Sequence, residues 1–168
     1  MSSSDLSAFD ASGLPDVSNY RVGIVVSEWN SEVTENLLRG CTETLSTCGF
    51  RLDNIHIYHV PGSFELPLGA SWLLENRQVH GVICLGAVVR GETPHFEFVS
   101  LACANGIQDV ALKYNKPVVF GVLTTDTAAQ AYDRSGGRLG NKGVEAAVTV
   151  IKMLGLQRQL DESWVGVK

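Results

Sequence analysis

The sequence lacks several features that would place the chain in a specialised class. Its 18 acidic and 13 basic residues give a net charge of −5, and no basic cluster is large enough to grip a nucleic-acid backbone. The longest nearly continuous apolar run, residues 82–89, is far too short to cross a bilayer. The opening MSSSDLSAFD has no basic start and no apolar centre, so it does not predict a signal peptide. These absences disfavour nucleic-acid and membrane partners and favour a cytoplasmic protein.

The sequence also lacks closely spaced cysteine pairs. The four cysteines form no CxxC pair, and each lies within a predicted helix or strand: Cys41, Cys48, Cys84 and Cys103. The first two would lie about 10 Å apart on one helix, which is too far for a disulfide. We therefore expect four reduced, packed cysteines and no metal site.

What the sequence does contain is an alternation of apolar strands and amphipathic helices. Predicted strands cover residues 20–26, 55–60, 79–86 and 118–123. Predicted helices lie between Asn30 as a cap and Gly49, over 67–76, from a Thr93 cap to 114, over 127–135, and over 141–154 up to a stop at Gly155.

This alternation predicts an α/β fold, a three-layer doubly wound sandwich around a four-stranded parallel sheet. Residues 1–19 are predicted to form an arm that is mobile or docked on a partner, and that can add a strand to a neighbour's sheet. Residues 20–156 are the predicted domain, and 157–168 are a polar tail. Ligands of such folds bind beyond the carboxyl ends of the strands, so candidate site residues should follow each strand.

The first two strand exits offer an aromatic and an acidic side chain. Trp29 follows the first strand and could stack on a flat heterocycle, although packing is its commoner role. The second strand is followed by PGSFELP, where Glu65 could accept hydrogen bonds from a polyol beside the apolar Phe64. An acid near a helix N-terminus is the plainer interpretation of Glu65, because the helix dipole favours it there.

The third strand exit, GAVVRGETPH, has the spacing of a nucleotide phosphate loop. Glu92, however, stands where that loop needs lysine, and its charge would repel a triphosphate. A single phosphate could still bind the free N–H groups at the start of the following helix. His95 lies in that first turn, where a neutral imidazole suits proton transfer, although a solvent-facing histidine fits equally well.

Two cations follow the fourth strand, in DRSGGRLGNKG. Arg134 could clamp a phosphate, and Lys142 begins the last helix, where a cation meets the unfavourable end of the dipole unless an anion or carbonyl lies nearby. A surface arginine and a solvated lysine are the alternative.

The ordered set of exits resembles lumazine synthases. The segments SEWN, PGSFELP, GAVVRGETPHFEF, VVFGVLTT and DRSGGRLGNKG carry the resemblance, which spans residues 20–156. It implies a flavodoxin-like fold and condensation of 5-amino-6-ribitylaminouracil with 3,4-dihydroxy-2-butanone 4-phosphate. The products would be 6,7-dimethyl-8-ribityllumazine, the immediate precursor of riboflavin, with phosphate and water, and no cofactor or metal would be used.

The resemblance also implies roles for single residues. Trp29 would stack on the pyrimidine, and His95 would transfer protons. The ring and ribityl chain would contact Ser63, Phe64, Glu65, Ala87, Val88, Val89 and Lys142, with Phe120 closing the site from a neighbouring subunit. The phosphate would bind Gly91, Glu92, Thr93 and Arg134.

Assembly and alternatives follow from the same resemblance. It implies a homopentamer with active sites at subunit interfaces. The short turn before the last helix permits an icosahedral shell of 60 chains, and riboflavin synthase is a possible partner. Two other interpretations stay open: a non-catalytic flavin- or pterin-binding module of the same fold, and a structural shell protein.

Overall fold

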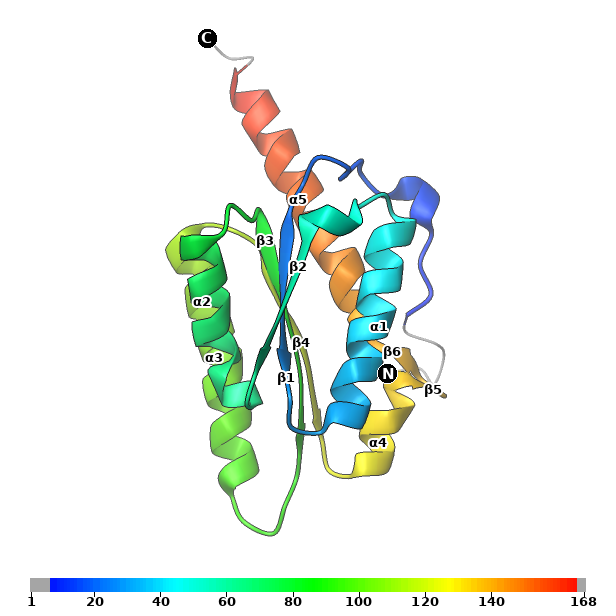
Figure 1. Ribbon diagram of the computed structural model, residues 1–168, viewed down its shortest axis with the longest axis vertical. Coiled ribbons are helices and arrows are strands. Elements are labelled where there is room, and N and C mark those ends of the chain that lie inside the picture. The colour runs from blue at the N-terminus through cyan, green and yellow to red at the C-terminus, as the bar shows by residue number, and fades with distance from the viewer. Residues whose placement is uncertain (1–6, 166–168) are drawn as a thin grey trace.

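A four-stranded parallel sheet runs through the centre of the chain, with its strands in the order β2-β1-β3-β4 (Figure 1). The computed structural model describes residues 7–165, with side chains up to residue 162. The strands are β1 (Val22–Ser27), β2 (Ile55–Val60), β3 (Gly81–Val89) and β4 (Val118–Thr125). The predicted α/β class and doubly wound, flavodoxin-like arrangement are confirmed.

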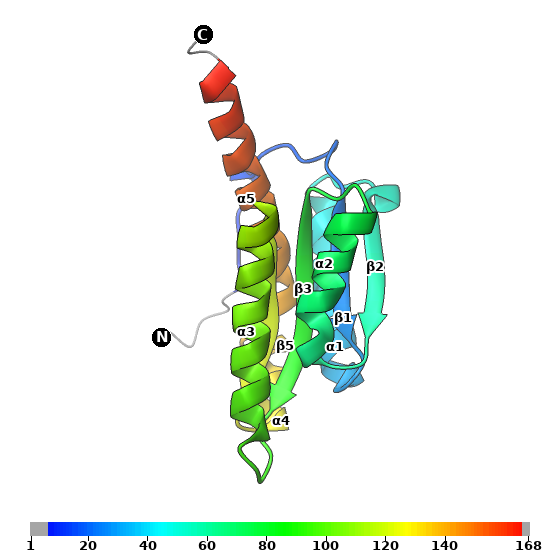
Figure 2. The same cartoon turned by 90° about the vertical axis from the view of Figure 1, so that its left-hand side faces the viewer.

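Helices cover both faces of this sheet (Figures 1 and 2). The helices are α1 (Ser31–Thr47), α2 (Leu66–Asn76), α3 (His95–Tyr114), α4 (Ala128–Asp133) and α5 (Lys142–Val165), with 3-10 turns η1 (Ala11–Gly13), η2 (Leu52–Asn54) and η3 (Ser63–Glu65). Helices α1, α4 and α5 lie on one face, and α2 and α3 on the other. A small hairpin of β5 (Ser135–Gly137) and β6 (Gly140–Asn141) precedes α5.

Each face of the sheet encloses its own apolar core. Along β1, Ile24 packs toward α1 and α5, whereas Val25 packs toward α2 and α3, because successive side chains of a strand point to opposite faces. All six residues of β1 are buried, as are the first seven of β3. A central strand of a covered parallel sheet is buried on both faces, which is why these strands lack polar alternation in sequence.

The start of α5 is packed against α1 through the GNKG segment. The Asn141 side chain accepts a hydrogen bond from Gly143 N at 2.8 Å and donates one to Asn36 O at 2.9 Å. A Cβ atom on Gly143 would lie 1.9 Å from Leu37 O, so only glycine permits this approach. The last predicted helix therefore begins at Lys142, one residue later than expected, with Asn141 as its cap.

The predicted end of this helix at Gly155 is wrong. Helix α5 continues through Gly155 to Val165 and projects from the body of the molecule (Figure 1). A Cβ at Gly155 would lie 2.4 Å from Pro15 Cγ, so the glycine makes room for the N-terminal segment rather than ending the helix. Arg158 fixes the extension by donating to Asp16 O at 3.1 Å, and the predicted polar tail 157–168 is helical up to residue 165.

The described part of the predicted arm, residues 7–19, packs on its own chain. Val17 is buried in the core beneath α1 and α5, and Leu14 packs against the same cluster. Residues 7–19 contain η1 and no strand. Residues 1–6 lie outside the described residues, so the pairing of the arm with a neighbour's sheet stays a prediction.

Two predicted helix caps differ in the structure. Helix α3 is capped by Pro94, one residue after the predicted Thr93, and no side chain bonds to its first turn. Asn30 does cap α1, but in a left-handed backbone conformation and without a side-chain capping bond. Asn and Thr are both good cap residues, but the Asn30 side chain donates to Ala87 O instead, at 2.9 Å.

The four cysteines are free thiols. Cys41, Cys84 and Cys103 are buried, and Cys48 is half-buried at the end of α1. Burial raises the pKa of Cys103 to about 12 and raises the pKa of Cys41 and Cys84 still further, which keeps these thiols protonated and unreactive. No helix within residues 7–165 combines the length and apolarity that a bilayer crossing requires.

A histidine joins the amino ends of the two central strands. His80 N donates to Arg21 O at 2.8 Å, and Arg21 N donates back to His80 Nδ1 at 2.9 Å. The Tyr20 ring packs edge-on against the imidazole, with centroids 5.1 Å apart. Burial lowers the pKa of His80, and the positive charges of Arg21 and Lys116 lower it further.

We therefore expect His80 to make stability depend on pH. Because its pKa is lower in the folded than in the unfolded chain, its contribution is complete above about pH 6.5 and is lost as the pH falls below it. In His80→Asn, whose amide oxygen can accept the Arg21 N–H, urea midpoints should fall less between about pH 7.5 and 5.5 than in the wild type. Parallel pH profiles for the two proteins would contradict this expectation.

Candidate functional site at the carboxyl ends of the strands

The exit of β1 lies against the exit of β2. Hydrogen bonds from Glu28 N to Val60 O at 2.9 Å and from Trp29 N to Pro61 O at 3.1 Å extend the pairing of these strands into the loops. A Cβ on Gly62 would lie 2.7 Å from Trp29 Cε3, so the indole rests directly on the Gly62 backbone. Trp29 is 66% exposed, which leaves a large aromatic surface available to a ligand.

The PGSFELP segment contains two polar atoms that are buried without a partner among the described residues. Ser63 Oγ and Glu65 Oε2 are buried and have no hydrogen-bond partner within the described chain. The same Gly62 Cβ position lies 3.1 Å from Glu65 Oε2, so the carboxylate and the indole are neighbours. Because a buried carboxylate oxygen without a partner is costly, a bound hydroxyl or N–H group is the simplest way to satisfy it.

A second buried hydroxyl, that of Ser27, belongs to the same region and was not among the predicted site residues. Ser27 ends β1, is 1% exposed, and its Oγ has no partner among the described residues. A Cβ on Gly86 would lie 2.6 Å from Ser63 Oγ and 3.3 Å from Ser27 Oγ, so glycine is required for both hydroxyls to approach β3. The signal in the sequence was a polar residue at the end of a wholly apolar strand.

The exit of β3 is anchored to that of β4 by Arg90. Its Nε donates to Asp126 Oδ1 at 2.7 Å, Nη1 lies 3.4 Å from Glu97 Oε1, and its guanidinium lies 4.4 Å from the centroid of the Phe96 ring. These contacts fix the beginning of the loop to α3. Neither Arg90 nor Asp126 was predicted as a site residue, although Arg90 lies inside the recognised GAVVRGETPH segment.

The loop beyond Arg90 carries the predicted phosphate-binding and catalytic residues. Gly91, Glu92, Thr93 and His95 are all exposed, and the loop projects beyond the sheet at the start of α3 (Figure 2). Among the described residues no side chain caps α3, so the N–H groups of its first turn remain available to an anion, apart from that of Glu97, which donates to Pro94 O at 3.0 Å. The structure thus keeps these four residues together, next to the exit of β3 that carries Ala87, Val88 and Val89.

The two predicted cations meet at one carboxylate. Arg134 Nη2 donates to Glu145 Oε1 at 2.6 Å, Lys142 Nζ donates to Glu145 Oε2 at 3.0 Å, and Arg134 Nη1 donates to Leu139 O at 2.6 Å. The Arg134 and Glu145 side chains are 16% and 21% exposed. Two of the five N–H donors of the guanidinium are thus used within the chain, and the others have no partner in the described part of it. Glu145, which the sequence analysis missed, is the anion that Lys142 requires at the start of α5.

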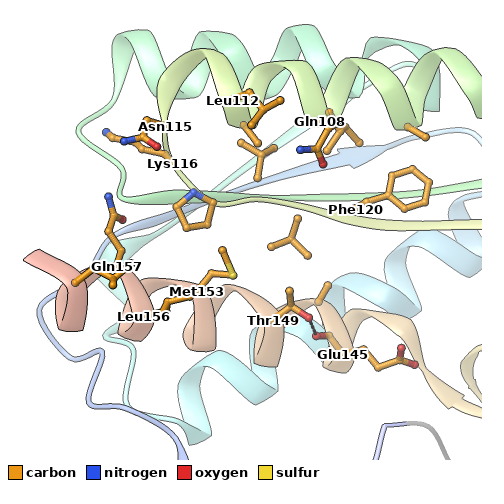
Figure 3. Close-up of a pocket in the computed structure, with 18 of the residues that line it drawn as sticks. Gln108, Leu112, Asn115, Lys116, Phe120, Glu145, Thr149, Met153, Leu156 and Gln157 are labelled. Atoms are coloured by element: carbon orange, nitrogen blue, oxygen red, sulfur yellow. Dashed lines mark hydrogen bonds between the residues drawn. The ribbon is translucent and has the colours of Figure 1, made fainter.

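Phe120 belongs to a groove at the open edge of the sheet. It lies on β4, where its register partner on β3 is Cys84. Cys84 comes five residues before Val89, the last residue of β3. The groove has a volume of about 750 Å³ and runs between α3 and α5, with Phe120 and Glu145 at one end (Figure 3). Lys142, which contacts Glu145, also lines it. Apolar side chains of both helices, among them Leu112 and Met153, line it farther along.

The candidate residues therefore form two separate sets in one chain. We call Trp29, Ser63, Phe64, Glu65, the β3 exit and the loop to His95 the exit set, and Phe120, Arg134, Lys142 and Glu145 the edge set. Among the described residues, no hydrogen bond, ion pair or pocket joins the two. No group of His, Cys, Asp and Glu side chains in residues 7–165 could hold a metal ion.

The Arg134–Glu145–Lys142 contacts should contribute to stability because they are largely shielded from water. Removing the charge in Glu145→Gln should cost about 1.5–3 kcal/mol, the range for hydrogen bonds to charged groups. Asp133→Asn removes only the pair with Arg138, whose side chain is 70% exposed, and should cost less than about 1 kcal/mol. Urea unfolding of the two variants measures the difference, and equal losses would contradict it.

Comparison with known proteins identifies the family. Residues 19–158 match the family model described as 6,7-dimethyl-8-ribityllumazine synthase. A protein of that name from Cytophaga hutchinsonii is 54% identical over 92% of this chain and 98% of its own length. Those from Parabacteroides distasonis and Porphyromonas gingivalis are 51% and 47% identical, over 89% and 92% of this chain and 94% and 96% of theirs. The chain belongs to the 6,7-dimethyl-8-ribityllumazine synthase family.

Proposed function

We propose that this chain is a transferase that condenses 5-amino-6-ribitylaminouracil with 3,4-dihydroxy-2-butanone 4-phosphate. The products are 6,7-dimethyl-8-ribityllumazine, phosphate and water. The observation that carries the proposal is a pair of buried atoms without a partner among the described residues, Glu65 Oε2 beside the exposed Trp29 and Ser63 Oγ beside Gly86. This arrangement lacks a partner for the exposed indole and hydrogen-bond partners for the two oxygens. A flat heterocycle with a polyol chain supplies both, because its ring can stack on Trp29 and its hydroxyls can form the hydrogen bonds.

The exit set receives the pyrimidine substrate. Trp29 stacks on the ring, Ser63, Phe64 and Glu65 hold the ring and the ribityl hydroxyls, and the backbone of residues 87–89 meets the edge of the heterocycle. Support comes from the contact of Trp29 with Gly62 and from the closeness of Glu65 to the same glycine.

The loop of residues 91–95 receives the phosphorylated ketone. Gly91, Glu92 and Thr93 surround the phosphate, with the uncapped N–H groups of α3 as donors. The uracil amine condenses with the ketone to give an imine and one water. Phosphate is then eliminated, the product tautomerises, and ring closure releases a second water. His95 transfers protons in these steps, which typically contributes about 10²–10⁴-fold. Holding the two reactants in contact contributes up to about 7–11 kcal/mol in favourable cases.

The edge set acts in a site completed by a second chain. Arg134 binds the phosphate with the donors that Glu145 and Leu139 leave free, Lys142 contacts the ring oxygens, and Phe120 closes the site. Their separation from the exit set within one chain supports a shared site. A symmetric ring of identical chains places the edge set of one subunit against the exit set of the next at every interface.

Assembly and location complete the proposal. The chain forms a homopentamer in the cytoplasm, its short turn before α5 permits a 60-chain icosahedral shell, and riboflavin synthase is a candidate partner. Residues 20–156 form the catalytic domain, residues 1–19 the arm and residues 157–168 the tail. A non-catalytic binding module would have no need of the charged edge set, which favours the enzyme over that alternative.

The direct test mixes both substrates with the purified wild-type chain and follows the fluorescent lumazine. We expect Trp29→Ala to raise the KM for the uracil substrate by about 5- to 150-fold, as loss of base stacking does elsewhere, with little effect on the other KM. Arg134→Ala should instead raise the KM for the phosphorylated ketone. A wild-type chain that forms no lumazine would refute the proposal.

A further inference from the structure

Asn30 has a backbone conformation that its place in the fold does not explain. In the described chain, the non-glycine residues with positive φ are Asn30, at φ 61°, and Asn115, at φ 50°. Asn115 ends α3, where a left-handed residue is ordinary. Asn30 begins α1, where a cap is normally extended and its side chain accepts a bond from the first turn. Asn30 makes no such bond.

The Asn30 side chain is used across the sheet instead. Its Nδ2 donates to Ala87 O at 2.9 Å. The pairing of β1 with β3 ends at Val26 and Leu85, so Ala87 lies two residues beyond the last β1 partner. Ala87 is 4% exposed, and a buried carbonyl needs a donor. The Asn30 amide replaces the backbone donor that β1 no longer supplies.

This bond spans the gap between the two sides of the exit set. Asn30 directly follows Trp29, whose indole is fixed on the other side by Gly62. Ala87 begins the segment 87–89, whose backbone faces the heterocycle in the proposed function. The left-handed turn at Asn30 and its bond to Ala87 therefore set the separation and the relative orientation of the indole and the β3 exit.

We propose that Asn30 is a positioning residue for the pyrimidine substrate, which acts by holding Ala87 and its neighbours at a fixed distance from Trp29. The inference rests on the proposed function and extends it to a residue that contacts the sheet. It implies that full affinity for the pyrimidine substrate needs the hydrogen bond from Asn30 Nδ2 to Ala87 O, and that the left-handed turn alone is not enough.

Two variants separate the bond from the turn. Asn30→Gly keeps the left-handed conformation without strain but has no amide. Asn30→Asp keeps the size and the tolerance for positive φ, but a carboxylate accepts hydrogen bonds and cannot donate to Ala87 O. Asn115→Gly is the matched control, because it changes the same residue type in the same conformation at the opposite end of the sheet.

The experiment measures equilibrium binding of 5-amino-6-ribitylaminouracil alone, by quenching of tryptophan fluorescence, and then both KM values, on full-length proteins. We expect both Asn30 variants to bind the uracil substrate about 3- to 10-fold more weakly, the usual effect of one lost hydrogen bond. The KM for the phosphorylated ketone should stay within about twofold, and Asn115→Gly should match the wild type.

The outcomes distinguish this inference from the proposed function. If the wild type forms lumazine and Asn30→Gly and Asn30→Asp bind the uracil substrate as tightly as it does, the positioning role is refuted and the function stands. An equal rise of both KM values indicates general damage and also refutes the role. If Asn30→Gly does not fold, Asn30→Asp decides alone. A wild type that forms no lumazine refutes the proposed function itself, and this inference with it.

Discussion

The unequal length of neighbouring parallel strands is the constraint on which the exit set depends. Strand β1 stops pairing with β3 at Val26 and Leu85, whereas β3 and β4 remain paired as far as Val89 and Thr125. The difference leaves Gly86 and Ala87 without β1 partners, beside the loops after β1 and β2. Near this point Ser27, Ser63 and Glu65 have buried polar atoms that find no hydrogen-bond partner in the described part of the chain.

Two glycines allow the segments around the end of β1 to approach one another closely. At Gly62 a methyl group would collide with the Trp29 ring, and at Gly86 it would collide with the Ser63 hydroxyl. Neither glycine has a positive φ, so close contact, and not backbone freedom, is the reason for both. The Trp29 ring and the Glu65 carboxylate therefore meet at Gly62, and the hydroxyls of Ser63 and Ser27 meet at Gly86.

The opposite edge of the sheet meets a different requirement. Among the described residues, strand β4 has no partner on its outer side. The groove along it is lined by apolar side chains and by Lys142 and Glu145, and Glu145 also binds Arg134. Glu145 keeps two cations close together by offering one oxygen to each. Among the described residues, no hydrogen bond or ion pair links this cluster to the exit set of the same chain.

The sequence was sufficient for the sheet and its flanking helices, because wholly apolar strands and turn-rich exits are local signals. It was insufficient wherever a contact distant in sequence decided the outcome. Gly155 looked like a helix stop, but Pro15 explains it; Asn30 looked like an ordinary cap, but Ala87 binds its side chain. Glu145 was hidden in a helix, and only its contacts with Arg134 and Lys142 reveal its role.

The central claim is that one active site needs the exit set of one chain and the edge set of another. The most direct measurement mixes two nearly inactive chains, Trp29→Ala/Glu65→Ala and Arg134→Ala/Lys142→Ala, by refolding them together, and follows lumazine formation. In randomly mixed rings, roughly a quarter of the sites receive two unaltered sets, so activity should rise well above that of either parent. Mixed rings no more active than the parents alone would contradict a shared site.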